Sequence, residues 1–209
     1  MRTTIILFAF ALLFTGCQHD SFKLKGTAEW MNDGDTVFLM RHADMDFPSD
    51  TMVVSKGSFT LSGQAETATL GIVFPKSDPD LGTIVFIEPG TIKVNLENEQ
   101  GKSTVGGTTA NEALQQANTI VNAYAQHIQQ LMRTIDSQHV SEENGHQLWS
   151  QMKDWQDEMT QRIIDLAEQN IDNEFGYLIV TNLDTNDLSK EKRHQLIELM
   201  PEEYRQRIK

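Results

Sequence analysis

Arg41 and His42 are the first residues whose types and order could do chemistry. They follow an apolar, strand-like run, Val37 to Met40, and open a polar loop. Phosphatases with a histidine nucleophile pair the two residues in this order at the end of a strand. Such a site also needs a second Arg and a second His in the pocket of a mixed α/β sheet, whereas further strands are predicted to follow here. We therefore expect a solvated hairpin loop, and a histidine-phosphatase-like enzyme through Arg41 and His42 is the less favoured alternative.

Other motifs with a chemical meaning are incomplete. Gly101-Lys102-Ser103-Thr104 ends like a phosphate-binding loop, but Leu96 occupies the position of the required first Gly. Asp184 begins a segment like a calcium loop, which then fails at its fifth and sixth positions, so Asp187 or Ser189 is expected to cap a helix instead. The histidines show no metal-ligand spacing. We predict no catalytic residue, no cofactor and no metal site.

Cys17 is the one residue for which the sequence predicts a covalent modification. Arg2 gives a short positive start, Ile5 to Phe14 is apolar, and Leu13-Phe14-Thr15-Gly16-Cys17 resembles a bacterial lipobox. The apolar run is too short to span a bilayer. We therefore predict that residues 1–17 are a lipoprotein signal peptide with its lipobox. Cys17 would carry acyl chains such as palmitate, and several chains would anchor the protein firmly to a membrane.

Composition excludes several functions. The chain has 209 residues, a formal charge of −13 and a single cysteine. A strongly acidic surface repels nucleic acid and anionic headgroups, so no nucleic-acid partner is expected. One cysteine allows neither an internal disulfide nor a C-x-x-C redox pair. The residues after Cys17 are enough for one medium domain or two small ones.

The rest of the chain has two parts that differ in their hydrophobic pattern, and together they predict an α+β protein. Residues 22–106 read as short strands separated by turns, such as those at Asp33-Gly34 and Glu88-Pro89-Gly90. This pattern predicts an N-terminal antiparallel β-sandwich or open barrel. Residues 110–209 follow the helical period and predict a C-terminal helical domain with a long helical hairpin.

The hairpin is predicted from two apolar stripes. One runs from Leu114 to Ile135 and the other from Leu148 to Leu166, with Ser141 as the expected cap of the second helix. Trp155 lies within the second stripe and is expected to be largely buried against the first helix. Shorter helices are expected near 174–183 and 189–199, and Pro201 would begin a last short helix.

The order of the strand and turn motifs resembles a family. "FKLKGTAEWMNDGDTVFLM", "DTMVVSKGSFTLSG", "FIEPGTIKVNL" and "GGTTAN" are similar to a domain of unknown function. It occurs in lipoproteins of a group of anaerobic Gram-negative bacteria and usually precedes a thioredoxin-like domain of the alkyl hydroperoxide reductase and thiol-disulfide oxidoreductase type. These residues contain no C-x-x-C pair and no such domain. The resemblance therefore implies an envelope lipoprotein and a fold, without an activity.

The expected function is that of a non-catalytic binding or scaffolding module in the cell envelope. The protein would be lipid-anchored through Cys17 to the inner or outer membrane, would face the periplasm or the exterior, and would have a protein partner in the envelope. The first alternative is an accessory protein that serves a separate thioredoxin-like thiol-disulfide system in trans. An exposed apolar patch would favour the binding role.

Overall fold

The computed structural model describes residues 20–41, 48–137 and 142–208. Within them, the N-terminal part forms eight strands, which match the predicted strand-rich region. Their bounds are β1 (Ser21–Thr27), β2 (Thr36–Arg41), β3 (Asp50–Val53), β4 (Ser58–Gln64), β5 (Thr69–Pro75), β6 (Thr83–Ile87), β7 (Gly90–Asn95) and β8 (Thr104–Gly106). A short 3-10 helix, η2 (Pro79–Leu81), precedes β6.

The strands form two four-stranded sheets that do not close into a barrel. Sheet A has the order β4-β1-β7-β8, and sheet B has the order β3-β2-β5-β6. The prediction of an antiparallel sandwich is confirmed except for one pair, because β1 and β7 run parallel, with Phe22 opposite Gly90 and Lys25 opposite Lys93. Alternation of apolar and polar residues cannot distinguish the two directions, since both give side chains a period of two.

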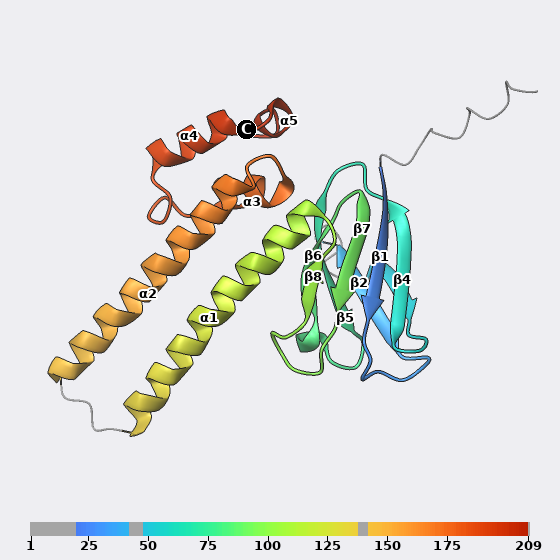
Figure 1. Cartoon of the computed structure of the whole chain (residues 1–209), viewed down its shortest axis with the longest axis horizontal. Helices are drawn as coiled ribbons and strands as arrows, with labels where there is room; N and C mark the ends of the chain where they lie inside the picture. The colour runs from blue at the N-terminus through green and yellow to red at the C-terminus, as the bar shows by residue number, and fades with distance from the viewer. Residues whose placement is uncertain (1–19, 42–47, 138–141, 209) are drawn as a thin grey trace, which may run out of the picture.

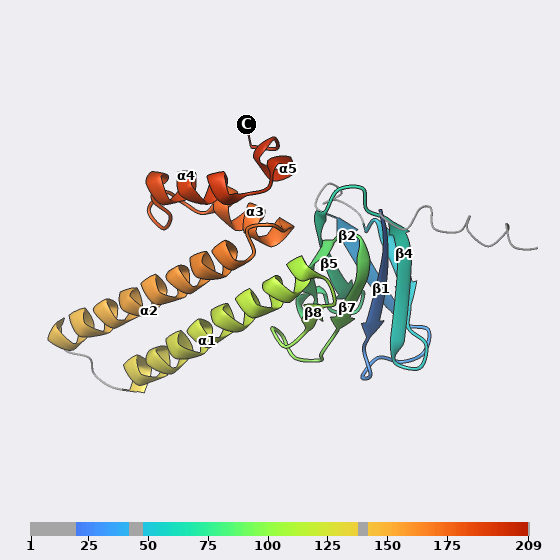
Figure 2. The same ribbon diagram turned by 45° about the horizontal axis from the view of Figure 1, so that its top comes forward.

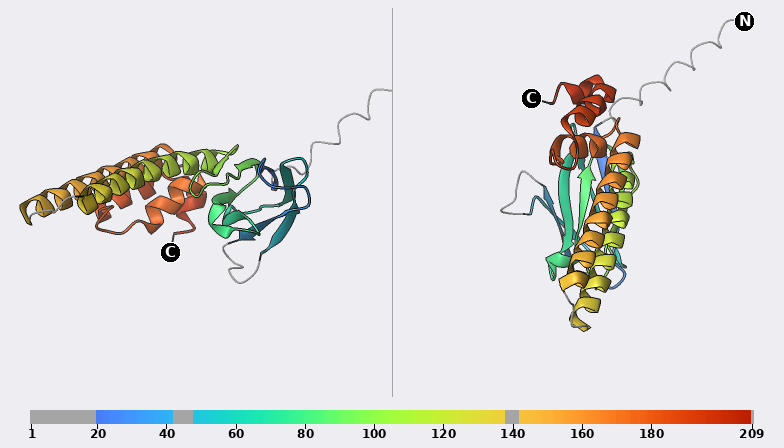
Figure 3. Two further views of the ribbon diagram at one scale, coloured as in Figure 1. Left: turned by 90° about the horizontal axis from the view of Figure 1, so that it is seen from below. Right: turned by 90° about the vertical axis from the view of Figure 1, so that its left-hand side faces the viewer.

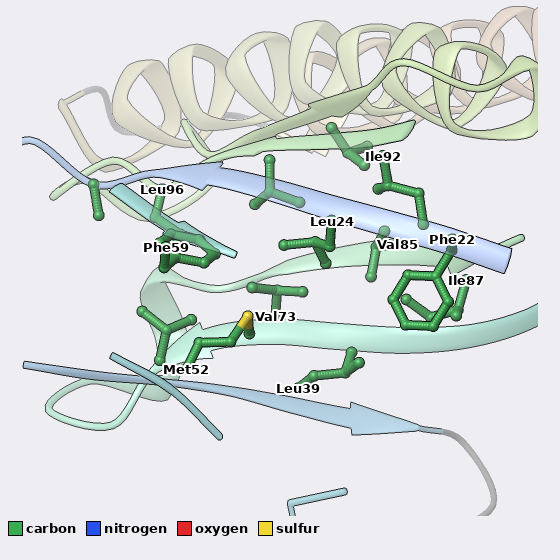
Figure 4. Packing of buried hydrophobic residues seen from close by; sticks show 14 of the residues in the cluster. Phe22, Leu24, Leu39, Met52, Phe59, Val73, Val85, Ile87, Ile92 and Leu96 are labelled. Atoms are coloured by element: carbon green, nitrogen blue, oxygen red, sulfur yellow. The ribbon is translucent and has the colours of Figure 1, made fainter. Parts of the chain in front are cut away.

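The core of the β domain lies between the sheets. Along β1, Phe22 and Leu24 are buried while Lys23 and Lys25 are exposed, as expected for a strand with one face covered. Figure 4 shows Leu24, Val73 and Val85 from different strands packed against one another in this core. Gly26 is needed for this packing, because a Cβ there would lie 2.0 Å from the ring of Phe59 on the neighbouring strand.

The C-terminal part is helical, in agreement with the prediction. It contains α1 (Thr109–Ser137), α2 (Glu142–Gln169), α3 (Glu174–Asn182), α4 (Lys190–Leu199) and α5 (Glu202–Arg205). The long helices α1 and α2 lie side by side and extend away from the β domain (Figures 1 and 2). The main strand contacts of α1 are with β8 and β6, and Figure 2 shows the far end of the hairpin projecting away from the sheets.

A second core joins the helices to one edge of the β domain. Phe86 of β6 packs there with Ala110 of α1, Ala167 of α2 and Phe175 of α3. The helices α3, α4 and α5 gather beside the ends of the hairpin nearest the sheets (Figures 1 and 3). Among the described helices, none has both the length and the apolarity that a bilayer-spanning segment requires.

The expected burial of Trp155 is only partly correct. Trp155 faces α1, and its ring lies 5.0 Å from that of His127, yet the side chain is half-buried. Two helices packed alone cover only part of each apolar stripe, because a third element is needed to close the seam. Trp149, which also lies in α2 but not at a position of the predicted stripe, is 70% exposed.

Candidate functional site

A fully buried asparagine joins the helical part to sheet B. Asn111, in the first turn of α1, accepts a hydrogen bond from the backbone N–H of Phe86 and donates one to the carbonyl oxygen of the same residue, each at 2.8 Å. Because β6 is an edge strand, these backbone groups have no neighbouring strand. The amide therefore takes the place of a strand and satisfies groups that would be costly to bury unpaired.

Glu88 caps the start of the same helix from the β domain. Its carboxylate accepts a hydrogen bond from the Thr108 hydroxyl and another from the backbone N–H of Ala110 at 3.2 Å. Burial raises the pKa of the Glu88 carboxyl, although these hydrogen bonds oppose the rise, and the nearby charge of Glu174 adds to it. A carboxylate at a helix N-terminus complements the helix dipole.

The glycines of the same motifs allow this close approach. Gly107 has a φ of +90°, and a Cβ there would lie 2.4 Å from the carbonyl oxygen of Thr91. Its N–H donates to the carboxylate of Glu112 at 2.7 Å. The segments "EPG" and "GGTTAN" thus meet in space, and together they build the junction between the sheets and α1.

A second polar cluster ties the C-terminal residues to α3. Arg207 donates two hydrogen bonds, at 2.8 and 2.7 Å, to the buried carboxylate of Glu174, and its guanidinium lies 4.1 Å from the centre of the Tyr177 ring. Tyr204 packs beside this pair. Burial, together with the negative charge of Glu174, raises the pKa of the Tyr204 hydroxyl to about 12.

Both clusters have the features of structural contacts. In the described part of the chain, no buried side-chain nitrogen or oxygen lacks a hydrogen-bond partner. Groups that are fully engaged with each other hold elements in place, whereas a binding or catalytic group needs capacity left for a ligand. Surfaces capable of recognition must therefore be sought on the outer faces of the two sheets.

The outer face of sheet B is apolar. Its described strands carry no charged side chain at any outward position between their ends. We call this surface the apolar face, and it comprises Phe38, Met40, Val53, Ile72, Phe74 and Ile84. Val53, Ile72 and Ile84 are 61%, 38% and 47% exposed. Phe38 and Phe74 pack edge to face, with ring centres 5.8 Å apart.

An apolar outer face is unusual for such a sheet. Antiparallel sheets with one solvated face normally alternate apolar and polar residues, as sheet A does here. One end of the sheet B surface is already covered, because Phe86 is buried in the helical core and Leu70 packs against it. The rest is not covered by any described element in this way, and contiguous apolar patches of this kind mark interaction sites.

Arg41 is engaged in contacts within the β domain. Its backbone N–H donates to the Ser49 hydroxyl at 3.1 Å, its guanidinium pairs with Asp50 at 3.4 Å, and the same group lies 5.5 Å from the centre of the Phe22 ring. His42 and Cys17 lie outside the described residues. Arg41 therefore has a structural role in joining β2 to β3. Nothing is concluded from the structure about His42 or Cys17.

The remaining candidate motifs have structural roles where they are described. The buried Ser103 hydroxyl donates to the Leu81 carbonyl at 2.7 Å, so the "GKST" segment is a strand connection. Ser189 caps α4 by accepting from the N–H of Lys192, as predicted. Pro201 stands at the N-cap of α5, one position before the expected one. Ser141 lies outside the described residues. Within residues 20–41, 48–137 and 142–208, no three metal-ligating side chains are grouped around a possible ion site.

These features define a two-sheet β domain whose exposed sheet edge is closed by the first turn of a helix. Residues 22–114 match the model of a family described as a domain of unknown function, DUF4369. The match confirms the resemblance inferred from the motif order. It ends just after Asn111, so the matched span includes the residues that close the edge of β6. No curated protein matches the chain.

Proposed function

We propose that the protein is a non-catalytic lipoprotein of the cell envelope that binds a protein partner through the apolar face of sheet B. The apolar face is the observation that carries this proposal. It combines two aromatic rings, a methionine and three branched aliphatic side chains without an intervening charge. Aromatic residues and Met are enriched, and charges are depleted, at the centres of protein interfaces.

The partner class follows from the same composition. A small polar ligand needs convergent hydrogen-bonding groups, and the outward positions of the described strands of sheet B offer only apolar side chains and threonines. A broad sheet surface of aliphatic and aromatic groups instead suits a complementary apolar surface of another protein. The membrane anchor on Cys17 would keep the protein where it meets that partner.

Site-specific photo-crosslinking in whole envelopes tests the binding role. A photo-reactive residue at position 84, on the apolar face, should give a discrete adduct with an envelope protein, whereas the same residue at position 126, on the exposed side of α1, should give none. Ile72→Lys should remove the adduct because it places a charge in the centre of the interface. Gln126→Lys, which adds the same charge elsewhere, should leave it. A chain that gives no adduct from position 84 would contradict the proposal.

The adduct also distinguishes the alternative role. An accessory to a thioredoxin-like system in trans would give an adduct whose second component contains a C-x-x-C domain. Any other envelope protein in the adduct would favour the more general binding or scaffolding role. A crosslink between two copies of this chain would assign the face to self-association.

Lipid attachment is tested separately. Cys17→Ser should abolish acylation and move the protein from the membrane fraction to the soluble fraction, because Cys17 is the only cysteine and stands at the end of the apolar run. The measurement is fractionation followed by mass spectrometry of the N-terminal peptide. If the variant stays as membrane-bound as the parent, the assignment of Cys17 as the anchor is wrong.

A further inference from the structure

The outer face of sheet A carries the opposite chemistry to that of sheet B. Lys23 and Lys25 project outward from β1, and Lys93 projects outward from the neighbouring strand β7. We call this surface the lysine face. Its other outward positions are small or uncharged, namely Ser58, Thr60, Ser62, Gln64, Thr27, Thr91, Asn95 and Thr104. Lys25 and Lys93 line a shallow depression of about 540 Å³ across β1 and β7.

The lysines of this face form no ion pair within the described residues. Lys25 stands directly opposite Lys93 in the parallel register, an arrangement of like charges that destabilises a sheet. None of the ion pairs among residues 20–41, 48–137 and 142–208 includes Lys23, Lys25 or Lys93. Glu112 lines the same depression, where its carboxylate accepts a hydrogen bond from the N–H of Gly107 and forms no ion pair with either lysine. An acidic protein thus gathers three lysines without ion-pair partners on one sheet face, with a single carboxylate, Glu112, lining the depression between them.

The position of this face in the sequence points to what it meets. β1 begins at Ser21, four residues after Cys17, and Lys23 follows two residues later. A fully extended chain spans about 3.5 Å per residue, so Lys23 can lie no more than about 20 Å from the acylated residue. Of the two outer faces of the β domain, only that of sheet A includes the strand that starts beside the proposed anchor.

We propose that the lysine face rests on anionic lipid headgroups of the membrane to which the protein is attached. The inference rests on the proposed attachment through Cys17. Near an anionic membrane surface each lysine favours the contact by about fivefold, and the effect decays over a Debye length of roughly 8 Å at physiological salt. Three lysines therefore orient a tethered domain without anchoring it. The apolar face, on the opposite side of the sandwich, then points away from the membrane toward its partner.

Amine labelling of the lipidated full chain tests the orientation. The protein is inserted in vesicles of phosphatidylcholine alone or of phosphatidylcholine mixed with phosphatidylglycerol, and is treated with a membrane-impermeant amine reagent. Mass spectrometry then gives the labelling rate of each lysine. In the anionic vesicles we expect Lys23, Lys25 and Lys93 to react about fivefold more slowly than in the neutral ones. Lys56, Lys76 and Lys102, which are exposed elsewhere, should react equally in both.

Variants and salt provide the matched controls. Lys25→Gln with Lys93→Gln should remove the protection of Lys23, whereas Lys56→Gln with Lys76→Gln should leave it. A high salt concentration should also remove it, since headgroup contacts of exposed charges are screened.

The possible failures are distinguishable. If the protein does not float with either kind of vesicle, the anchor itself is absent and the inference falls with it. If the protein floats but the three lysines react equally in both vesicles, the anchor stands and the orientation is overturned. Equal protection in neutral and anionic vesicles would likewise overturn recognition of the headgroup charge.

Discussion

At the scale of single residues, Asn111 is the most deeply buried of the buried polar and charged residues in the described structure. It is fully buried, and both its amide oxygen and its amide nitrogen bond the backbone of Phe86. Asn111→Ala would leave a backbone donor and a backbone acceptor buried without partners. Each such group costs about 1–3 kcal/mol, so we expect the free energy of unfolding to fall by roughly 2 kcal/mol or more.

Urea unfolding followed by circular dichroism measures this loss. Asn122→Ala is the matched control on the same helix, because Asn122 makes one exposed hydrogen bond, to the Gly101 carbonyl at 3.1 Å. That variant should lie within the range of ordinary surface changes, about 0.5 kcal/mol. Equal effects of the two substitutions would mean that the amide of Asn111 does not hold the edge of β6.

Glu88 should make the stability of the protein depend on pH in an unusual direction. Because burial raises its pKa, ionisation of Glu88 costs more in the folded protein than in the unfolded chain. Its contribution is fully favourable below the unfolded pKa, near 4.5, and is lost as the pH rises through the higher folded pKa. Glu88→Gln keeps an acceptor oxygen for Thr108 and Ala110 but cannot ionise.

The variant should therefore gain stability relative to the parent as the pH rises from about 4 to 7. Parallel urea titrations at both pH values measure the difference. Glu99→Gln, at an exposed position of the β7 to β8 connection, supplies the control and should give no such trend. A constant difference between parent and Glu88→Gln would show that burial does not raise the pKa of this carboxyl.

At the scale of elements, the pair of Arg207 and Glu174 holds the C-terminal segment against α3. Arg207→Ala would leave the carboxylate of Glu174 buried without its partner, which destabilises a protein strongly when both groups are inaccessible. Arg207 is partly exposed, so solvent reduces the effect, and we expect a loss of about 1–2 kcal/mol. Arg205→Ala, which removes an exposed pair with Glu202 and an exposed hydrogen bond to the Glu198 carbonyl, should change stability by no more than about 0.5 kcal/mol. Thermal unfolding compares the two variants. If Arg207→Ala is no less stable than Arg205→Ala, the C-terminal segment is held against α3 by other contacts.

The helical hairpin makes its own prediction through Trp155. Truncation of a large side chain in a closed core costs about 3–5 kcal/mol, but a half-buried ring loses only part of its contacts. We expect Trp155→Ala to lower the free energy of unfolding by about 2 kcal/mol. Trp149→Ala, at the 70% exposed position, should have little effect. Thermal unfolding followed by circular dichroism checks both variants. An unchanged unfolding transition for Trp155→Ala would show that packing of Trp155 between α1 and α2 does not stabilise the protein.

The elements themselves were largely predictable, the strands from residue types and turn signals and the helices from periodicity. Strand-forming residue types and turn spacing predict seven strands between residues 22 and 97, each within a few residues of the observed bounds, and the two stripes predict α1 and α2. The strand β8 was missed because three residues are too few to display a period. The parallel pairing of β1 with β7 and the junction of Glu88 with Ala110, 22 residues apart, depend on how distant segments meet. The order of the motifs indicated the family resemblance, but it did not indicate that these segments are in contact.

At the scale of the whole molecule, the two sheets give the β domain unlike outer faces. One is lined by lysines and the other has no charge, although the chain as a whole carries −13. Net charge therefore describes neither face. If the proposed orientation holds, the expected repulsion between this acidic protein and anionic headgroups would not extend to the lysine face.

The closure of β6 by Asn111 has a consequence for how the protein is made. During translation, the strands of sheet B emerge from the ribosome before the residue that completes its edge. Until the first turn of α1 appears, the backbone of Phe86 can pair with a strand from another chain, as open edges do. A nascent chain released at Gly106 should scatter light through aggregation, and one released at Gln116 should stay clear. We therefore expect the smallest part of the chain that folds without aggregating to contain both sheets and the first turn of α1.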